Sequence, residues 1–207
     1  MLIAAVCLLL AFVFTQVATD VREGDLTEID RAIRQFMITH QSATGVALLR
    51  VITVLAAKEI LVPISILIGW WLSGRGLAAV SLLALCGLVS AEFVDLLKLE
   101  FHVDRPLAEM RGSRSFSFPS GHVSGAAAIA MLLSYVAWKR KRGVVATPLV
   151  GAVFVVLTAV SRLYLDRHWA SDVFGGALIG LPIGLAFCAL LELWTRHGAR
   201  PVAGART

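Results

Sequence analysis

The sequence contains few charged residues and few cysteines. Asp, Glu, Lys and Arg make up only 16% of the 207 residues, 58% are hydrophobic, and the mean hydropathy is +0.81. A soluble globular domain carries about 25% charged residues. The three cysteines, Cys7, Cys86 and Cys188, all lie in apolar runs, where a thiol behaves as a small hydrophobic group. The composition argues against a disulfide framework or a metal cluster and predicts a multi-pass membrane protein.

A basic patch of the kind that binds nucleic acid is also missing. The net charge is +5, but the basic residues are dispersed between apolar runs, with one compact cluster at Lys139 to Arg142. We interpret this cluster as a topology signal and expect no nucleic-acid partner. The first seventeen residues lack a basic leader and a convincing small-residue cleavage site. They are interpreted as a retained first span, with a cleaved signal peptide as the alternative.

Six apolar stretches approach the roughly 20 residues that a helix needs to cross the hydrocarbon layer. They are residues 2–18, 57–74, 76–98, 120–138, 144–165 and 171–194. Basic residues follow the second, fourth and sixth stretches, namely Arg75, then Lys139 to Arg142, then Arg196, Arg200 and Arg206. By the positive-inside rule, these links face the cytoplasm. The sequence predicts an all-α integral membrane bundle of six transmembrane helices, forming a single domain over 1–207 with its core at about 57–194.

Residues 19–56 connect the first two spans and are expected to contain an amphipathic helix in the membrane plane. Asp25 is a plausible N-cap with Glu28 as its capping-box partner. Apolar residues follow at helical spacing: Leu26, Ile29, Ile33, Phe36 and Met37. The opposite face carries Glu28, Asp30, Arg31 and Arg34, and we expect it to be solvated. Residues 45–57, apolar apart from Arg50, either extend the second span or lie at the interface.

Three short polar islands interrupt the apolar background. They run from Lys98 to Pro106, from Pro119 to His122 and from Ser161 to Asp172. The predicted topology places all three at the outer membrane surface. Ionisable residues at a membrane boundary are costly to keep and indicate a functional site by default. Because helices of a compact bundle can bring the islands together, we expect them to form one site.

The islands contain the groups that bind an anion. Lys98, Arg105 and Arg162 are cations without an equal number of acids beside them. An arginine fork matches phosphate oxygens, and a lysine adds a mobile point charge. Ser120 and Gly121 open a predicted helix, whose unpaired N–H groups and dipole attract an anion. The pattern predicts a phosphate cradle.

Two histidines add the means of catalysis to this cradle. His168 and Asp172 are four residues apart and share a helix face, so the carboxylate can bind one ring nitrogen and leave the other as a nucleophile. His122 can protonate the departing alkoxide and later activate water. This combination predicts phosphoryl transfer through a phosphohistidine.

The three islands together resemble the signature of the type-2 phosphatidic acid phosphatase superfamily. The chain reads K-x6-R-P from Lys98, P-S-G-H from Pro119 and S-R-x5-H-x3-D from Ser161, with every signature position occupied. The resemblance implies a six-helix bacterial membrane lipid phosphatase that uses neither a metal nor another cofactor. Many relatives carry a second Arg-Pro where this chain has Leu107-Ala108, a departure that concerns the substrate and not the catalytic residues.

The resemblance also assigns roles to the residues that match the signature. His168 is the expected nucleophile, Asp172 orients it, and His122 is the acid and base. The expected phosphate ligands are Lys98, Arg105, Ser120, Gly121 and Arg162. Four neighbours at variable positions are interpreted as solvated boundary residues: His102, Asp104, Asp166 and Arg167. Asp95 is expected to pair with Lys98, and Glu192 to pair with a cation or reach the headgroups.

The expected reaction is hydrolysis of a lipid phosphate or diphosphate monoester at the extracytoplasmic face of the plasma membrane. Candidate substrates are polyprenyl diphosphates, phosphatidylglycerophosphate and phosphatidic acid, and membrane lipids are the expected partners. Phosphotransfer to a lipid or sugar hydroxyl would use the same phosphohistidine and stays open as an alternative. A non-catalytic lipid-phosphate binder or transporter is the third hypothesis.

Overall fold

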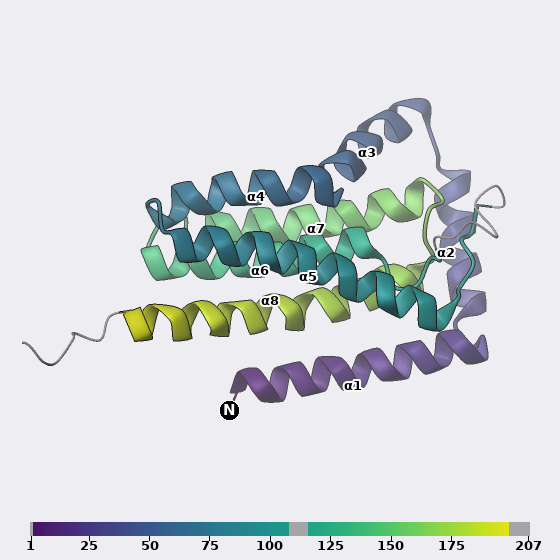
Figure 1. Cartoon of the computed structure of the whole chain (residues 1–207). Coiled ribbons are helices and arrows are strands. Elements are labelled where there is room, and N and C mark those ends of the chain that lie inside the picture. The colour runs from purple at the N-terminus through teal and green to yellow at the C-terminus, as the bar shows by residue number, and fades with distance from the viewer. Residues whose placement is uncertain (1, 108–115, 199–207) are drawn as a thin grey trace, which may run out of the picture.

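The computed structural model describes residues 2–107 and 116–198, and these residues form α-helices and no strand. The helices are α1 (Leu2–Glu23), α2 (Thr27–Thr39), α3 (Ala43–Leu55), α4 (Lys58–Ser73), α5 (Leu77–Phe101), α6 (Gly121–Arg140), α7 (Ala146–Tyr164) and α8 (Ala170–Gly198). Most of them run side by side as one bundle (Figure 1). Ala108, which follows the first island, and Arg200 and Arg206 of the charge pattern fall outside the described residues.

Five helices are long and apolar enough to cross a membrane, namely α1, α5, α6, α7 and α8. The second predicted span is shorter than expected, because α4 has 16 residues and rises only about 24 Å. It nevertheless contacts α5 and α6 and runs along the same bundle (Figure 1). The predicted all-α membrane bundle is confirmed, with α4 as its one short member among the described helices.

α2 lies across one end of the bundle, as expected for a helix in the membrane plane (Figure 1). The predicted capping box is wrong, because the N-cap is Leu26 and no side chain caps the helix. α3 follows after a bend of 120° and is capped by Ser42, whose Oγ accepts a hydrogen bond from Gly45 N at 3.1 Å. Residues 43–55 therefore form a separate helix instead of extending the second span.

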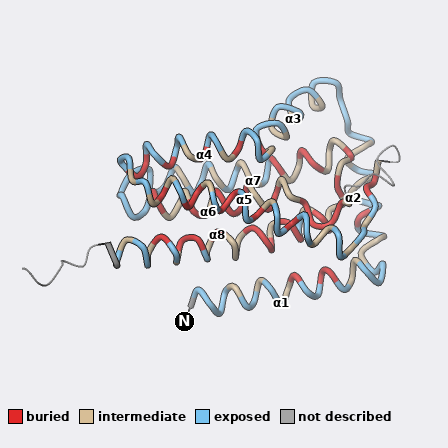
Figure 2. Tube along the Cα trace, viewed as in Figure 1, coloured by how far each residue is buried: buried red, intermediate tan, exposed pale blue. Residues whose placement is uncertain are grey.

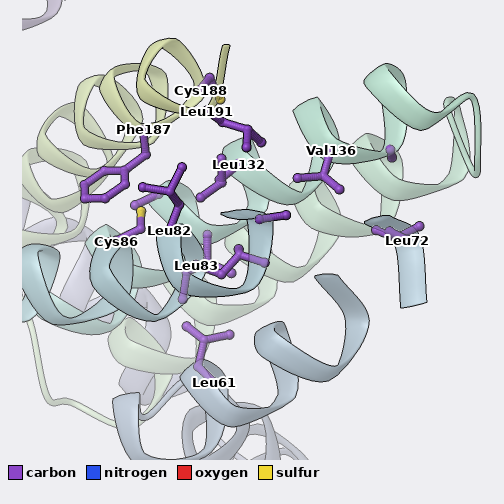
Figure 3. Close-up of a cluster of buried hydrophobic side chains, with 14 of the residues drawn as sticks. Leu61, Leu72, Leu82, Leu83, Cys86, Leu132, Val136, Phe187, Cys188 and Leu191 are labelled. Atoms are coloured by element: carbon purple, nitrogen blue, oxygen red, sulfur yellow. The ribbon is translucent and has the colours of Figure 1, made fainter. Parts of the chain in front are cut away.

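The core of the bundle lies around α6, which contacts α4, α5, α7 and α8. A cluster of buried side chains joins α6 to these neighbours and includes Leu83, Cys86, Leu132 and Phe187 (Figure 3). Buried positions concentrate inside the bundle, whereas outward positions are exposed (Figure 2). Many of the exposed residues are apolar, as expected for helices that face lipid.

A stripe of glycines brings α8 unusually close to α6. A Cβ atom added at Gly176 would lie 2.5 Å from the carbonyl oxygen of Ser120, and one at Gly184 would lie 2.7 Å from that of Ala128. At Gly180, between them, an added Cβ would collide with Ser124 O. Backbone atoms cannot move aside as the end of a side chain can, so these positions require glycine. Such small-residue contacts let membrane helices approach closely, and they place the first turn of α6 beside that of α8.

Candidate active site

His168 and Asp172 form a buried pair where α8 begins. His168 lies in the short connection between α7 and α8, and Asp172 lies in the first turn of α8. His168 Nδ1 is 3.1 Å from Asp172 Oδ2, and both side chains are almost completely excluded from solvent. The four-residue spacing has the effect expected from the sequence, because the carboxylate holds one ring nitrogen. This bond leaves Nε2 of His168 for chemistry.

Asp172 is held in place by further donors. The Trp169 backbone N–H donates to Asp172 Oδ2 at 2.8 Å, and Ser117 Oγ donates to Oδ1 at 3.3 Å. The backbone of Asp172 also takes part, because its carbonyl accepts a hydrogen bond from Ser120 N at 2.9 Å. A carboxylate fixed by several donors keeps its imidazole partner in one tautomer and orientation. A backbone hydrogen bond thus joins the beginnings of α6 and α8 beside His168.

Arg105 contacts the other ring nitrogen of His168. Its Nη1 lies 3.4 Å from His168 Nε2 and donates to the Arg167 carbonyl at 2.9 Å. Burial lowers the pKa of His168 well below 6.5, and the charges of Arg162, Arg105 and Lys98 lower it further. The imidazole therefore stays neutral, with a proton on Nδ1 and a lone pair on Nε2. A neutral imidazole with one free nitrogen is the form that attacks phosphorus.

Two buried polar atoms of the predicted phosphate cradle have no hydrogen-bond partner, Ser120 Oγ and Arg162 Nε. Ser120 is completely buried at the N-cap of α6, and Arg162 is 7% exposed in the last turn of α7. Buried polar groups are usually hydrogen-bonded, and unsatisfied ones need an explanation. A bound oxyanion would supply both partners.

Lys98 and His122 complete the arrangement on the α5 and α6 side. Lys98 Nζ pairs with Asp95 at 3.2 Å, as predicted, and lies 3.8 Å from the position a Cβ of Gly121 would take. Both Lys98 and His122 line a cavity of about 170 Å³ between α4, α5 and α6. The eight predicted site residues thus lie at one end of the bundle, grouped around His168.

The structure shows contacts to this site that the sequence interpretation missed. Asp30 of α2 is 9% exposed and accepts hydrogen bonds from Ser171 N at 2.9 Å and Ser171 Oγ at 2.6 Å. Arg34, one helical turn later, donates from Nε and Nη2 to the two carboxylate oxygens of Asp166, each at 2.7 Å. α2 is therefore hydrogen-bonded to both ends of residues 166–171, the segment that contains His168.

The expectation that Asp30, Arg34 and Asp166 are solvated is therefore wrong. Asp166 is 7% exposed, because its carboxylate faces α2 and not solvent. The hydrogen bonds to Asp166 raise the pKa of Arg34. The only local sign was that Asp30 and Arg34 are four residues apart and so share one helix face. His102 and Asp104 are exposed, as predicted, and Glu192 pairs with Lys139 and with Arg196.

Ser117 and Trp169 are two further residues that hold the islands together. Ser117 N donates to the Val103 carbonyl at 2.7 Å, and its hydroxyl reaches Asp172. Trp169 Nε1 donates to the Asp104 carbonyl at 2.8 Å. Both residues link the first island to the third, so Trp169 does more than anchor the chain at an interface.

Sequence comparison identifies the family to which the chain is related. The family model described as PAP2 superfamily matches residues 1–196. Phosphatidylglycerophosphatase B of Bacillus subtilis is 29% identical over 142 residues, which cover 63% of this chain and 67% of that protein. Undecaprenyl-diphosphatase BcrC of Bacillus subtilis is 36% identical over 77 residues, or 37% of this chain and 36% of that protein.

A solved structure shares the whole architecture. The transmembrane PAP2-type phosphatidylglycerolphosphate phosphatase from Bacillus subtilis matches with a TM-score of 0.79 at 24% identity. The match covers 94% of this chain and 98% of that chain, so the fold is common to both. Its name, like those of the two relatives, describes a phosphoric ester or anhydride hydrolase, in agreement with the expected enzyme class. The chain belongs to the PAP2 superfamily, as a multi-pass membrane phosphatase of that family.

Proposed function

We propose that the protein hydrolyses a phosphate or diphosphate monoester of a lipid through a phosphohistidine on His168. The observation that carries this proposal is the buried imidazole of His168, bound through Nδ1 to Asp172, with Nε2 beside Arg105. Ser120 Oγ and Arg162 Nε, both buried without a partner, supply donors for the phosphoryl oxygens. The site thus combines a nucleophile with an electrostatic cradle, the two requirements of phosphoryl transfer.

In the first step, His168 Nε2 attacks phosphorus, and the bond from phosphorus to the lipid oxygen breaks. The electron pair of that bond stays on the departing oxygen, which takes a proton from His122, whose protonated form is favoured only when the negative charge of the bound phosphate lies beside it. Asp172 stabilises the positive charge that develops on the His168 ring. The lipid leaves as an alcohol, or as a lipid monophosphate when the substrate is a diphosphate.

In the second step, a water molecule attacks the phosphohistidine. His122, now neutral, accepts a proton from this water while the bond from phosphorus to Nε2 breaks. Inorganic phosphate is released, His168 returns to its neutral form, and His122 carries its proton again. One water is consumed for each ester or anhydride bond cleaved, so atoms and charges balance over the cycle.

The cavity between α4, α5 and α6 suits the lipid part of the substrate. Its lining combines His122 and Lys98 at the site with apolar or small residues, including Leu61, Ala91 and Gly125, and with three further charged residues, Lys58, Glu59 and Asp95. The proton donor therefore faces the side from which a lipid oxygen would depart. The names of the relatives favour a phosphatidylglycerophosphate or a polyprenyl diphosphate as the substrate.

The positions of the basic residues support a site on the extracytoplasmic side of the plasma membrane. Lys139 and Arg140 end α6, and Arg196 lies near the end of α8, so these cations lie at the bundle end away from His122 and Asp172. By the positive-inside rule, that end faces the cytoplasm. A substrate would then reach the site from the outer leaflet.

Turnover by the purified protein tests this function. We expect release of inorganic phosphate from a panel of phosphatidylglycerophosphate, undecaprenyl diphosphate and phosphatidic acid, and a fall of at least about 10³-fold in His168→Ala. Acid-sensitive, alkali-stable label on the wild-type protein after a rapid quench would reveal the phosphohistidine.

His102→Asn is the matched control, because His102 is exposed at the end of α5 and asparagine tolerates its φ of 53°. This variant should retain both turnover and label. Full turnover by a folded His168→Ala protein would disprove the mechanism. Transfer of the label to an organic acceptor instead of water would identify a phosphotransferase, and binding without turnover would identify a lipid-phosphate binder.

A further inference from the structure

A second cavity, of about 340 Å³, has Arg162 in its lining. It is lined by Arg50, Thr53, Val54, Arg162, Leu165 and Arg167. This set shares no residue with the lining of the cavity that contains His122 and Lys98. Three of its six lining residues are arginines, and none carries a carboxylate. Such a concentration of positive charge attracts an anion.

Arg50 is an unusual residue for its helix. It is the single charged side chain of α3, whose neighbouring residues Leu48 and Val51 are exposed apolar residues of the kind that face lipid. No acidic residue in the described ranges 2–107 and 116–198 forms an ion pair with Arg50. An arginine on an apolar helix is costly unless an anion or water compensates its charge.

α3 is fixed against the end of α7 beside the catalytic site. Thr53 Oγ1 and Ser161 Oγ share a hydrogen bond of 2.8 Å, and Ser161 directly precedes Arg162. This contact holds the two helices that carry Arg50 and Arg162 in register. Arg162 is 93% buried, and its Nε has no partner. In the proposed function that Nε is a ligand of the reacting phosphate, and an anion in this cavity would add to the compensation of the same buried positive charge and of the charge of Arg50.

We propose that this cavity is a second phosphate-binding site, formed by Arg50, Arg162 and Arg167. It binds a phosphate group next to the catalytic cradle, on a side separate from the lipid cavity. The inference rests on the proposed function in one respect, because it takes Arg162 as a ligand of the reacting phosphate. Released inorganic phosphate and the headgroup of a neighbouring anionic lipid share the chemistry that the arginines recognise.

The number of phosphate ions bound per chain tests the proposal. The His168→Ala protein, which cannot form a phosphohistidine, is placed in nanodiscs of phosphatidylcholine and dialysed against radiolabelled inorganic phosphate. We expect two phosphates per chain in this background. Adding Arg50→Gln should abolish one site or weaken it at least about tenfold, the effect of one lost charged hydrogen bond. Adding Arg31→Gln, an exposed arginine of α2, should leave both sites.

Nanodiscs that contain phosphatidylglycerol distinguish the two sources of the phosphate group. If the headgroup occupies the site, the count falls to one per chain, and Arg50→Gln has no further effect; if free phosphate is the ligand, the count stays at two. A phosphate count in phosphatidylcholine that Arg50→Gln leaves unchanged would overturn the proposal, whereas a single phosphate that Arg50→Gln removes would show that the catalytic cradle is the site that fails to bind. Because binding is counted without turnover, this result is independent of whether the wild-type protein hydrolyses lipid phosphates.

Discussion

Arg34 and Asp166 are 132 residues apart in the sequence, yet they are joined by two parallel hydrogen bonds of 2.7 Å. The bonds connect the helix that crosses the end of the bundle to the segment that carries His168. They represent the bidentate geometry that makes arginine–carboxylate pairs specific. Arg34 also lies over the ring of Trp169, 5.8 Å from its centroid.

A double-mutant cycle on this pair should show strong coupling. Arg34→Gln and Asp166→Asn should each lower kcat about tenfold, because a small displacement of the nucleophile is costly. Each should reduce stability by only about 1 kcal/mol, since the pair is partly exposed to solvent. The double variant should be no worse than either single one. Asparagine is chosen because it tolerates the φ of 54° at position 166.

The readouts for this cycle are kcat, KM and the unfolding temperature in the same detergent. Arg31→Gln removes an exposed arginine from the same helix and should leave all three unchanged. Additive losses in the double variant would show that the two side chains act independently and would refute the positioning role.

Asp172→Asn should abolish most of the activity while the protein stays folded. An asparagine amide can donate to the His168 ring, which favours the tautomer with a proton on Nε2 and removes the nucleophilic lone pair. We expect kcat to fall about 10³- to 10⁴-fold, as for comparable changes in catalytic triads. Ser117→Ala removes the 3.3 Å bond to Asp172 and the contacts of the same hydroxyl with the Val103 and Asp104 carbonyls, but it leaves the bond between Asp172 and His168 and should cost far less. Equal losses in the two variants would contradict this assignment.

The closeness of α6 and α8 should make Gly180 intolerant of even one methyl group. An added Cβ would collide with Ser124 O and lie 2.9 Å from Ala127 Cβ. We expect Gly180→Ala to destabilise the protein by about 1–3 kcal/mol, the usual cost of overpacking. Gly125→Ala is the matched control, since its Cβ would meet only Leu61 Cδ2 at 3.8 Å. Thermal unfolding in detergent measures both, and equal stabilities would disprove the close contact.

The neutral state of His168 predicts a specific dependence of stability on pH. Its pKa in the folded protein lies well below 6.5, the value for an unfolded chain. Below pH 6.5 an unfolded His168 binds a proton that the folded protein excludes, so the contribution of His168 to stability decreases as the pH falls towards its folded-state pKa. The contribution has a maximum slope of about 1.4 kcal/mol per pH unit. This contribution is fully present only above pH 6.5.

Unfolding of the wild type and of His168→Gln between pH 5 and pH 8 checks this dependence. Glutamine cannot titrate, so the variant should lose this part of the slope below pH 6.5. His102→Asn, which removes an exposed histidine, should keep the wild-type slope. A wild-type slope that survives in His168→Gln would assign the acid sensitivity to other groups.

The sequence sufficed to predict the bundle and to identify residues that the structure brings together at one end of it, because hydrophobic length and the three islands are local signals. It failed where a contact depends on tertiary structure. Asp30 looks like a solvated helix residue, and only the position of Ser171 makes it a buried acceptor. The sequence did not predict that α3 ends at Leu55, because apolar residues continue beyond this position. The predicted capping box at Asp25 does not form, because the chain makes a turn around Gly24 instead.

The glycine stripe of α8 has a consequence for the evolution of the protein. Because α6 and α8 meet backbone to backbone at Gly176, Gly180 and Gly184, the separation of His122 from Asp172 does not depend on the sizes of surrounding side chains. Apolar residues elsewhere in the bundle can then drift without altering the reacting distances. The contact between the two helices thus fixes the separation of the two predicted catalytic groups.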